Sequence, residues 1–173
     1  MLPKVTLICL QSLDGFLART QTDDLSWGSP EDKKHFKTKV QSTGAMIIGR
    51  NTFDQMGTKL FNSQFVLVLT SQVENYTELK TPNRHFFNGT PLEALKYLES
   101  IEITEVVLGG GGNINNQFLA SNLVDEIFIT IGAKIFGEGI KVFGEKPLGN
   151  NLELLSLEKL GKDDFLIHYK VQK

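Results

Sequence analysis

Four consecutive glycines, Gly109–Gly112, separate the apolar run Val106–Leu108 from a helix-like stretch that begins at Asn113 and Ile114. An apolar run followed by a bare turn and a helix start predicts a strand-turn-helix unit whose backbone N–H groups are free to meet a phosphate. Each glycine costs roughly 0.5–1 kcal/mol relative to alanine, a penalty that a plain turn does not require. The sequence therefore predicts a nucleotide-phosphate site, with a purely structural turn as the alternative, at Gly109, Gly110, Gly111, Gly112, Asn113 and Ile114.

Length and composition limit the class of protein. The 173 residues suit a single domain spanning 1–173, and the 40% hydrophobic content suits a buried core. A net charge of −2 provides no basic surface, so neither nucleic acid nor an anionic membrane is expected as a partner. The single cysteine, Cys9, cannot form a disulfide framework and fits a reducing cytoplasm, and the apolar segment around it is too short for a signal peptide or a membrane span. The three histidines are scattered, so no metal site is predicted.

Apolar runs separated by helical segments predict the fold class. Five runs suit buried strands, and two later stretches alternate in the manner of antiparallel strands. This order predicts an α/β protein of three layers, with helices on both faces of a mostly parallel central sheet and an antiparallel C-terminal edge. The expected strands are 5–10, 45–48, 65–69, 106–108, 127–131, 152–160 and 165–171, and the expected helices are 30–41, 51–56 and 91–100.

An ordered set of short motifs resembles a known family. The set consists of Ser12–Gly15, Trp27 ahead of 30–32, Ile48–Phe53, Val68–Gln72, the glycine turn, Leu123–Glu126 and Phe136–Gly139. In order and spacing, these motifs resemble dihydrofolate reductase and its relative, the reductase domain of bacterial riboflavin synthesis. The resemblance implies a dihydrofolate reductase-like fold, an NADPH-dependent oxidoreductase and a small-molecule substrate. The resemblance to the riboflavin-synthesis reductases also suggests a homodimer.

The resemblance further implies which residues hold NADPH. They are Gly49, Arg50 and Thr52 at a helix N-terminus, Thr70 and Ser71 beside the adenosine ribose phosphate, and Leu17 and Ala18 along the nicotinamide. A guanidinium and hydroxyls are charge-assisted donors suited to a 2′-phosphate, whereas NADH recognition would require an acid. Arg50 as an ordinary surface arginine is the alternative.

For the substrate, the resemblance implies Trp27, Asp32 and Phe36, with Thr130 supporting the acid. A carboxyl buried beside an apolar ring has a raised pKa, which allows it to help deliver a proton while the cofactor delivers hydride. Asp32 could instead be a first-turn acid that complements a helix dipole, and Trp27 could be part of the core.

Two departures separate this chain from the riboflavin enzymes that it resembles. Ile8 stands where those enzymes usually carry a lysine, and 53–57 lacks their Asp-Asp-Pro segment. With these departures, the resemblance implies an NADPH-dependent reductase of a pterin-like or aminopyrimidine-type heterocycle, resembling 5-amino-6-(5-phosphoribosylamino)uracil reductase. A dihydrofolate reductase and a non-catalytic nucleotide-binding protein are the alternatives.

Overall fold

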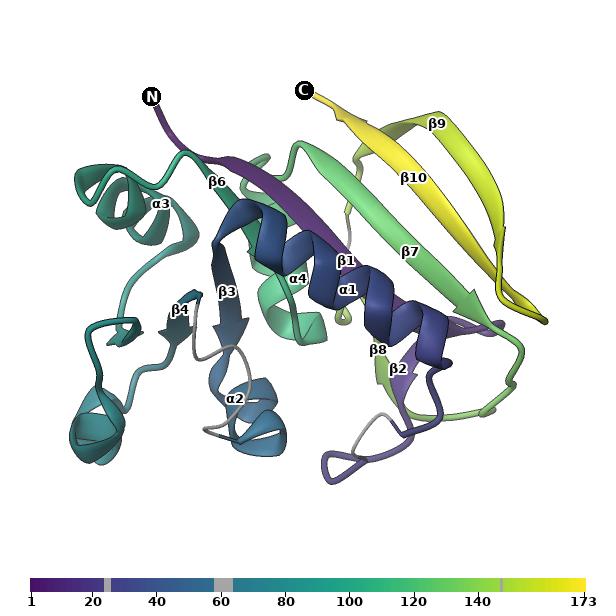
Figure 1. Cartoon of the computed structure of the whole chain (residues 1–173), viewed down its shortest axis with the longest axis horizontal. Coiled ribbons are helices and arrows are strands. Elements are labelled where there is room, and N and C mark those ends of the chain that lie inside the picture. The colour runs from purple at the N-terminus through teal and green to yellow at the C-terminus, as the bar shows by residue number, and fades with distance from the viewer. Residues whose placement is uncertain (24–25, 58–63, 147) are drawn as a thin grey trace.

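One eight-stranded sheet forms the centre of the molecule (Figure 1). The structure, a computed structural model, describes residues 1–23, 26–57, 64–146 and 148–173. In spatial order the strands are β5 (Arg84–Phe87), β4 (Phe65–Leu69), β3 (Ala45–Gly49), β6 (Glu105–Leu108), β1 (Lys4–Ser12), β7 (Glu126–Gly132), β10 (Asp164–Gln172) and β9 (Asn151–Leu160).

The pairing directions agree with the expected fold class. Strands β5 to β7 in this order are parallel, and β10 and β9 add an antiparallel edge. The central parallel strands β3, β4 and β6 read as mainly apolar runs because both of their faces are buried. The prediction of a mostly parallel sheet with an antiparallel C-terminal edge is confirmed. The assignment of 1–173 to a single domain stays a prediction.

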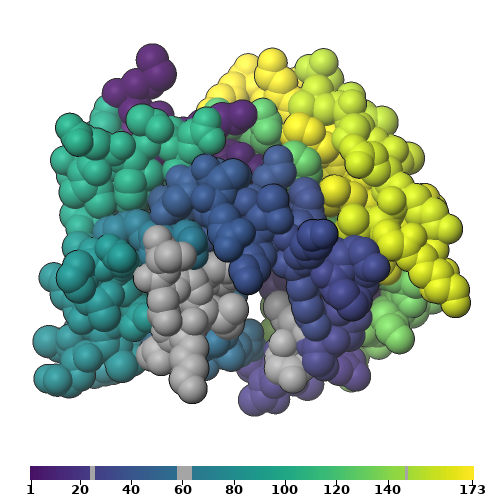
Figure 2. Space-filling model, viewed as in Figure 1, coloured from purple at the N-terminus to yellow at the C-terminus, as the bar shows by residue number. Residues whose placement is uncertain are grey.

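Helices cover both faces of the sheet. Helices α1 (Pro30–Thr43) and α2 (Arg50–Met56) contribute Val40 and Phe53 to the core on one face. Helices α3 (Pro91–Ser100) and α4 (Gly112–Ala120) contribute Leu95 and Phe118 to the core on the other. In the view of Figure 2, α1 crosses the front of the molecule, and β9 and β10 form one side of it. Among the described residues, no helix combines the length and hydrophobicity needed to cross a membrane.

The structure contains four short elements that the sequence did not predict. They are β2 (Phe16–Ala18), β8 (Ile140–Lys141), β5 and the 3-10 helix η1 (Val73–Leu79). Strands β2 and β8 pair with each other in a separate two-stranded sheet. Segments of two or three residues carry too little periodicity to be recognised, because their pairing is fixed by tertiary contacts.

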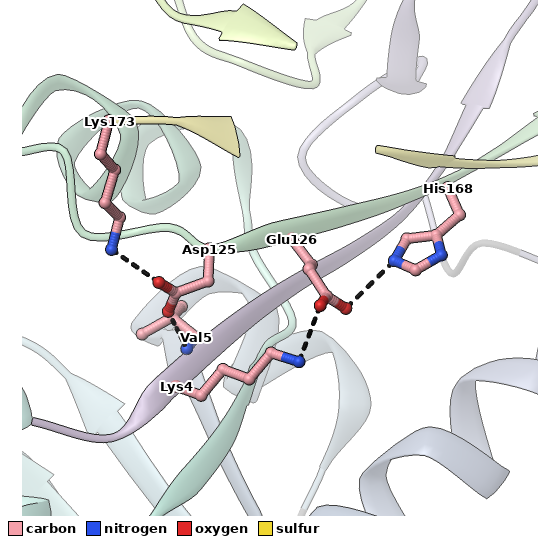
Figure 3. Close-up of polar contacts among 6 residues, drawn as sticks. All are labelled: Lys4, Val5, Asp125, Glu126, His168 and Lys173. Carbon is pink, nitrogen blue, oxygen red and sulfur yellow. Dashed lines mark hydrogen bonds and ion pairs between the residues drawn. The ribbon is translucent and has the colours of Figure 1, made fainter. Parts of the chain in front are cut away.

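Charged residues tie β1, β7 and β10 together at the amino-terminal end of β1 (Figure 3). Glu126 accepts from Lys4 Nζ at 2.7 Å and pairs with His168 Nε2 at 3.0 Å. Asp125 accepts from Val5 N at 2.7 Å and from Lys173 Nζ at 2.6 Å. The Leu123–Glu126 motif therefore joins strands far from the glycine turn.

Candidate active site

Three of the segments predicted to hold a cofactor lie at one edge of the sheet. Strands β3, β4 and β6 run parallel, and they end at Gly49, Leu69 and Leu108. The residues that follow are Arg50, Thr70 and Gly109, so all three segments leave the sheet at the carboxyl ends of its strands. This edge is where open α/β sheets bind their ligands.

The glycine turn is tied to β3 by backbone hydrogen bonds. Gly49 N donates to Gly110 O at 2.8 Å, and Gly109 N donates to Ile47 O at 2.9 Å. Gly110 has a φ of +89°, which L side chains rarely adopt, and its peptide bond to Gly111 is cis. Gly111 is the N-cap of α4, so the first N–H groups of this helix point toward the turn.

Bare backbone lets two other segments come close to the glycine turn. A Cβ on Gly111 would lie 3.4 Å from Thr52 Oγ1 and 3.8 Å from Leu17 Cδ2. A Cβ on Gly49 would lie 2.8 Å from Ile114 Cγ1, closer than real side chains approach. The structure thus brings together the turn, the first turn of α2 and the segment that carries Leu17.

Packing against the neighbouring chain explains why residue 112 is a glycine, whether or not a ligand binds. A Cβ there would lie 2.1 Å from the carbonyl oxygen of Lys141 and 3.3 Å from Gly144 N. The next turn of α4 bonds the same segment, because Asn115 Nδ2 donates to Val142 O at 2.9 Å. Gly112 is buried, whereas the neighbouring Asn113 is exposed. The lack of a side chain at Gly112 therefore leaves room for the chain around β8. Gly109, Gly110 and Gly111 shape the turn itself.

Arg50 lies beside an aromatic residue that the sequence did not single out. Its guanidinium interacts with the hydroxyl of Tyr76, which donates to Asp54 Oδ2 at 3.0 Å. Burial and Asp54 raise the pKa of Tyr76, and Arg50 acts in the opposite direction. The Tyr76 ring stacks on Phe86 with centroids 4.8 Å apart, which fixes the position of its hydroxyl.

Thr70 and Ser71 lie between β4 and η1. The Thr70 hydroxyl accepts from Gln72 N at 3.1 Å, a bond that closes the turn after the strand. Ser71 is exposed. Ser71 and Arg50 are thus both open to solvent at the same edge of the sheet.

The segment carrying Leu17 and Ala18 is held by pairing and by one carboxylate. Ala18 is buried and pairs with Ile140, while Leu17 is half-buried. Asp14 accepts from Ser12 Oγ at 2.6 Å and from Gly137 N at 2.7 Å, and the Ser12 bond is the main cause of its lowered pKa. This carboxylate joins the segment to the loop after β7.

At the other side of the site, Asp32 begins α1 and is nevertheless buried. Its N–H donates to Ser29 Oγ at 3.2 Å, which is a helix N-cap bond. Its side chain is covered, with 8% of the residue exposed, so it is no solvated first-turn charge. Burial raises the pKa of Asp32, Asp164 raises it further, and Thr130 and Lys33 lower it.

Thr130 and Asp164 act on this acid, and Trp27 packs at Gly132, two residues after Thr130; we call these four residues the Asp32 cluster. The Thr130 hydroxyl faces Asp32 and is fully buried, although it makes no hydrogen bond of normal geometry within the described part of the chain. Asp164 is buried too, and its Oδ1 accepts from Ala133 N at 3.2 Å. The Trp27 ring fills the space left by Gly132, where a Cβ would lie 2.6 Å from Cζ3. The buried Nε1 of Trp27 has no hydrogen-bond partner among the described residues.

Phe36 connects the two sides of the site. It lies one helical turn after Asp32, and its Cζ would lie 3.4 Å from a Cβ on Gly109. The sequence missed Asp164, Asp54 and Tyr76. The only local signal for Asp164 was its place directly before the apolar residues Phe165–Ile167, and its carboxylate is held by Ala133 N just after β7.

Comparison with known proteins gives consistent results. YwjB of Bacillus subtilis (strain 168), a protein of uncharacterised function, is 24% identical over 165 residues that cover 92% of this chain and 93% of YwjB. The structure of a putative riboflavin biosynthesis protein from Shewanella sp. PV-4 superposes with a TM-score of 0.80 and 22% identity, covering 98% of this chain and 99% of that one.

Dihydrofolate reductase from Enterococcus faecalis, solved with NADP(H) and RAB-propyl, gives a TM-score of 0.70 and 21% identity, covering 98% of this chain and 97% of that one. These likenesses establish a dihydrofolate reductase-like fold. The family model of the RibD C-terminal domain matches residues 3–166, so this chain belongs to the RibD C-terminal domain family.

Proposed function

We propose that this protein is an NADPH-dependent reductase of a pterin-like or aminopyrimidine-type heterocycle. The observation that carries the proposal is the position of Phe36, one helical turn after the buried Asp32 and with its Cζ 3.4 Å from where a Cβ on Gly109 would lie, which brings a phosphate-binding geometry near a buried acid. A nucleotide-binding turn alone would not require a buried carboxyl nearby. A reductase needs both, because hydride and proton must reach the same heterocycle.

The residues at the sheet edge fit a dinucleotide. Gly109 and Gly111 are partly exposed backbone that a pyrophosphate can approach, Gly110 fixes the turn between them, and α4 behind them supplies N–H groups and a partial positive charge. In this proposal Gly49, Gly112, Asn113 and Ile114 complete the phosphate site. Arg50, Thr52, Thr70 and Ser71 hold the phosphates of the cofactor, and Leu17 and Ala18 line its nicotinamide end.

NADPH, when bound, supplies the hydride. The protein's own residues then orient the heterocycle and manage a proton. Asp32, whose pKa is raised mainly by burial, holds a proton at its carboxyl and hydrogen-bonds the ring. Thr130 orients that carboxyl, and Phe36 and Trp27 cover the ring and exclude water.

Of the two candidate substrates, we prefer the one used in riboflavin synthesis. Support comes from the match to the RibD C-terminal domain and from the Shewanella relative described as a putative riboflavin biosynthesis protein. The proposed substrate resembles 5-amino-6-(5-phosphoribosylamino)uracil, and dihydrofolate is the second candidate. We also propose a cytoplasmic location, which suits the free and buried Cys9.

The test measures NADPH oxidation with two substrates. The phosphoribosylaminouracil and dihydrofolate are added in parallel to protein whose NADPH and NADH affinities have been determined by calorimetry. Oxidation of NADPH with the first substrate supports the riboflavin assignment, and oxidation with dihydrofolate moves the protein to the folate side. NADPH binding without turnover of either leaves a nucleotide-binding protein, and absence of NADPH binding removes the proposal.

A further inference from the structure

Asp164 is a second buried carboxyl near the proposed acid, and the proposed reaction gives it no role. It is the first residue of β10, and 8% of it is exposed, the same fraction as for Asp32. The preceding residue, Asp163, is exposed. Aspartates are rarely buried unless a neighbouring group compensates for the lost water. Two buried carboxyls in one part of a small protein therefore require a physical explanation.

Strand register places Asp164 on the same face of the sheet as Thr130. Leu166 pairs with Thr130, and Asp164 lies two residues before Leu166, so the alternation of β10 points both of its side chains to the side of Thr130. Leu166 shares a core cluster with Val40 of α1, and α1 crosses this face of the sheet in Figure 1. Asp32 lies in the first turn of that helix, so both carboxyls lie between α1 and the sheet.

The turn between β9 and β10 contacts the start of α1. Gly161 lies in that turn, and a Cβ on it would lie 2.9 Å from Glu31 Cδ. Glu31 directly precedes Asp32, so this contact and the strand register together hold Asp164 near Asp32. Burial is the largest cause of the raised pKa of Asp32, and the charge of Asp164 raises it further.

The surroundings of the two carboxyls differ in what they offer to a negative charge. Asp164 Oδ1 accepts from Ala133 N at 3.2 Å, and a hydrogen bond from a backbone N–H favours the charged form of a carboxyl. Burial, by contrast, favours the neutral form of Asp32. Two neighbouring carboxyls in unlike surroundings take separate roles, one holding the proton and the other the charge. The proton therefore belongs to Asp32 and the charge to Asp164.

The other groups that act on Asp32 do not add a negative charge. Against the effect of burial, the hydroxyl of Thr130 on β7 and the ammonium of Lys33 on α1 lower the pKa of Asp32. Cys9 on β1 also interacts with Asp32, but burial raises the pKa of its thiol, which stays uncharged at neutral pH. Within the part of the chain that the structure describes, Asp164 is therefore the like charge that acts on the acid.

We propose that Asp164 is a positioning residue for the proton of the reaction, because its buried carboxylate keeps Asp32 protonated at the pH at which the heterocycle is reduced. A negative charge nearby makes loss of the Asp32 proton less favourable, so the acid persists to higher pH than burial alone would allow. The inference rests on the proposed function for its use in catalysis. The interaction between the two carboxyls does not, because it exists with or without a substrate.

The experiment compares Asp164→Asn with the parent and with a matched control, Asp163→Asn. Asparagine keeps an oxygen that can accept from Ala133 N and removes the charge. The control removes the same charge from the exposed neighbouring residue, where solvent screens it. Two quantities are measured across the pH range in which the proteins stay folded. They are the titration of the Asp32 carboxyl, followed by NMR without substrate, and kcat for the substrate that the parent reduces.

In Asp164→Asn, the titration midpoint of Asp32 and the alkaline limb of kcat should both move to lower pH by about one unit, the size of one like charge at the effective dielectric constant of a protein. At a pH above both midpoints, kcat should therefore fall about tenfold. At a pH below both midpoints it should equal that of the parent, which a general loss of structure would not allow. In Asp163→Asn both quantities should match the parent.

An Asp32 midpoint that is the same in Asp164→Asn and in the parent overturns the proposal. A shifted midpoint with an unmoved alkaline limb overturns the role in the reaction. If neither candidate substrate is turned over, the proposed function fails, and the NMR titration still accepts or rejects the interaction of the carboxyls. If circular dichroism shows that Asp164→Asn does not fold, the parent decides. Its Asp164 signal must then show a step at the midpoint of Asp32, because interacting carboxyls titrate as a pair, and a signal without that step rejects the proposal.

Discussion

The two sides of the candidate site differ in how they are made. The glycine turn consists of backbone held to β3 by hydrogen bonds between peptide groups, and Arg50 and Ser71, at the same end of the parallel strands, are exposed. The Asp32 cluster consists of side chains: the buried Asp32, Thr130 and Asp164, and the half-buried Trp27, whose Nε1 is buried. A site of the first kind can bind a large polar cofactor with little rearrangement. A site of the second kind tunes the chemistry of one group.

This difference predicts that changes on the two sides will affect different measurements. Substitutions in the Asp32 cluster should lower turnover and leave NADPH affinity alone. Substitutions around the glycine turn should lower NADPH affinity and leave turnover alone. A variant that moved both measurements equally would show that the two sides act as one unit.

The largest effect is expected from Asp32→Asn, which keeps the shape of the side chain and removes its acid. Turnover of the substrate that the parent reduces should fall by about 10²–10⁴-fold, the range for a lost acid–base group. NADPH affinity measured by calorimetry should be nearly unchanged. Full activity in this variant would return Asp32 to the role of a helix-start residue.

The pH dependence of turnover provides the control for Asp32→Asn. The raised pKa of Asp32 means that the parent loses the protonated acid, and with it activity, as pH rises through that pKa. The Asn variant should lack this limb. The same shift makes the parent's folded state lose stability as pH rises from the unfolded pKa of Asp32 through its higher folded pKa. At neutral pH the Asn variant should therefore melt no lower than the parent, so unfolding cannot account for its lost turnover.

The next effect is expected at Gly110, whose φ of +89° disfavours any side chain. Gly110→Val should weaken NADPH binding by tenfold or more, equivalent to about 1.4 kcal/mol or more. The matched control is Gly137→Val, because Gly137 has a similar φ of +77° and a Cβ there would meet no described atom within 4 Å. Both variants should lose thermal stability, measured without ligand. Only Gly110→Val should lose the increase in melting temperature that NADPH gives.

The sequence predicted the backbone side of the site better than the side-chain side. The glycine turn and helix 91–100 were predictable because their signals are local: bare residues after an apolar run, and a capping box that the structure confirms at Thr90 and Glu93. The burial of Asp164 was not predictable, because its carboxylate is held by the backbone N–H of Ala133, just after β7 and more than 30 residues away in the sequence. Tyr76 was not predictable for the same reason, since its partner Asp54 lies on another element.

The strand pattern shows the same limit. The expected strand 152–160 agrees with β9, but alternation alone did not reveal that its apolar side is exposed. The register shifts between His168 and Tyr169, so Leu155 has no paired residue and the alternation breaks there. Periodicity gives the faces of a strand, and only the assembled sheet tells which face remains uncovered.

A smaller effect is expected from Arg50→Ala. A lost charge-assisted contact with a 2′-phosphate costs about 1.5–3 kcal/mol, or roughly tenfold to a hundredfold in affinity. Because Arg50 is exposed, solvent screening should keep the loss near the lower end. Calorimetry with NADPH and NADH measures the preference, which the variant should largely lose. Equal affinities for the two cofactors in the parent would contradict the proposed role.

The smallest effect is expected from Tyr76→Phe, which separates the hydroxyl from the ring. The ring contacts with Phe86 and Phe53 remain, so stability should change little. Without the hydroxyl between them, Arg50 and Asp54 lose their shared partner, and Arg50 is held less firmly for a phosphate. NADPH affinity should fall by about two- to tenfold, the equivalent of one hydrogen bond, while NADH affinity stays constant.

The double variant with Arg50→Ala decides whether Tyr76 acts through the arginine. If it does, Tyr76→Phe should have no further effect on NADPH affinity once Arg50 is absent, because the two changes remove one interaction. Additive losses would mean that the hydroxyl meets the cofactor itself. A loss of NADH affinity as large as that of NADPH would instead assign Tyr76 to the adenine end, and the cofactor side would then be less purely backbone than its glycines suggest.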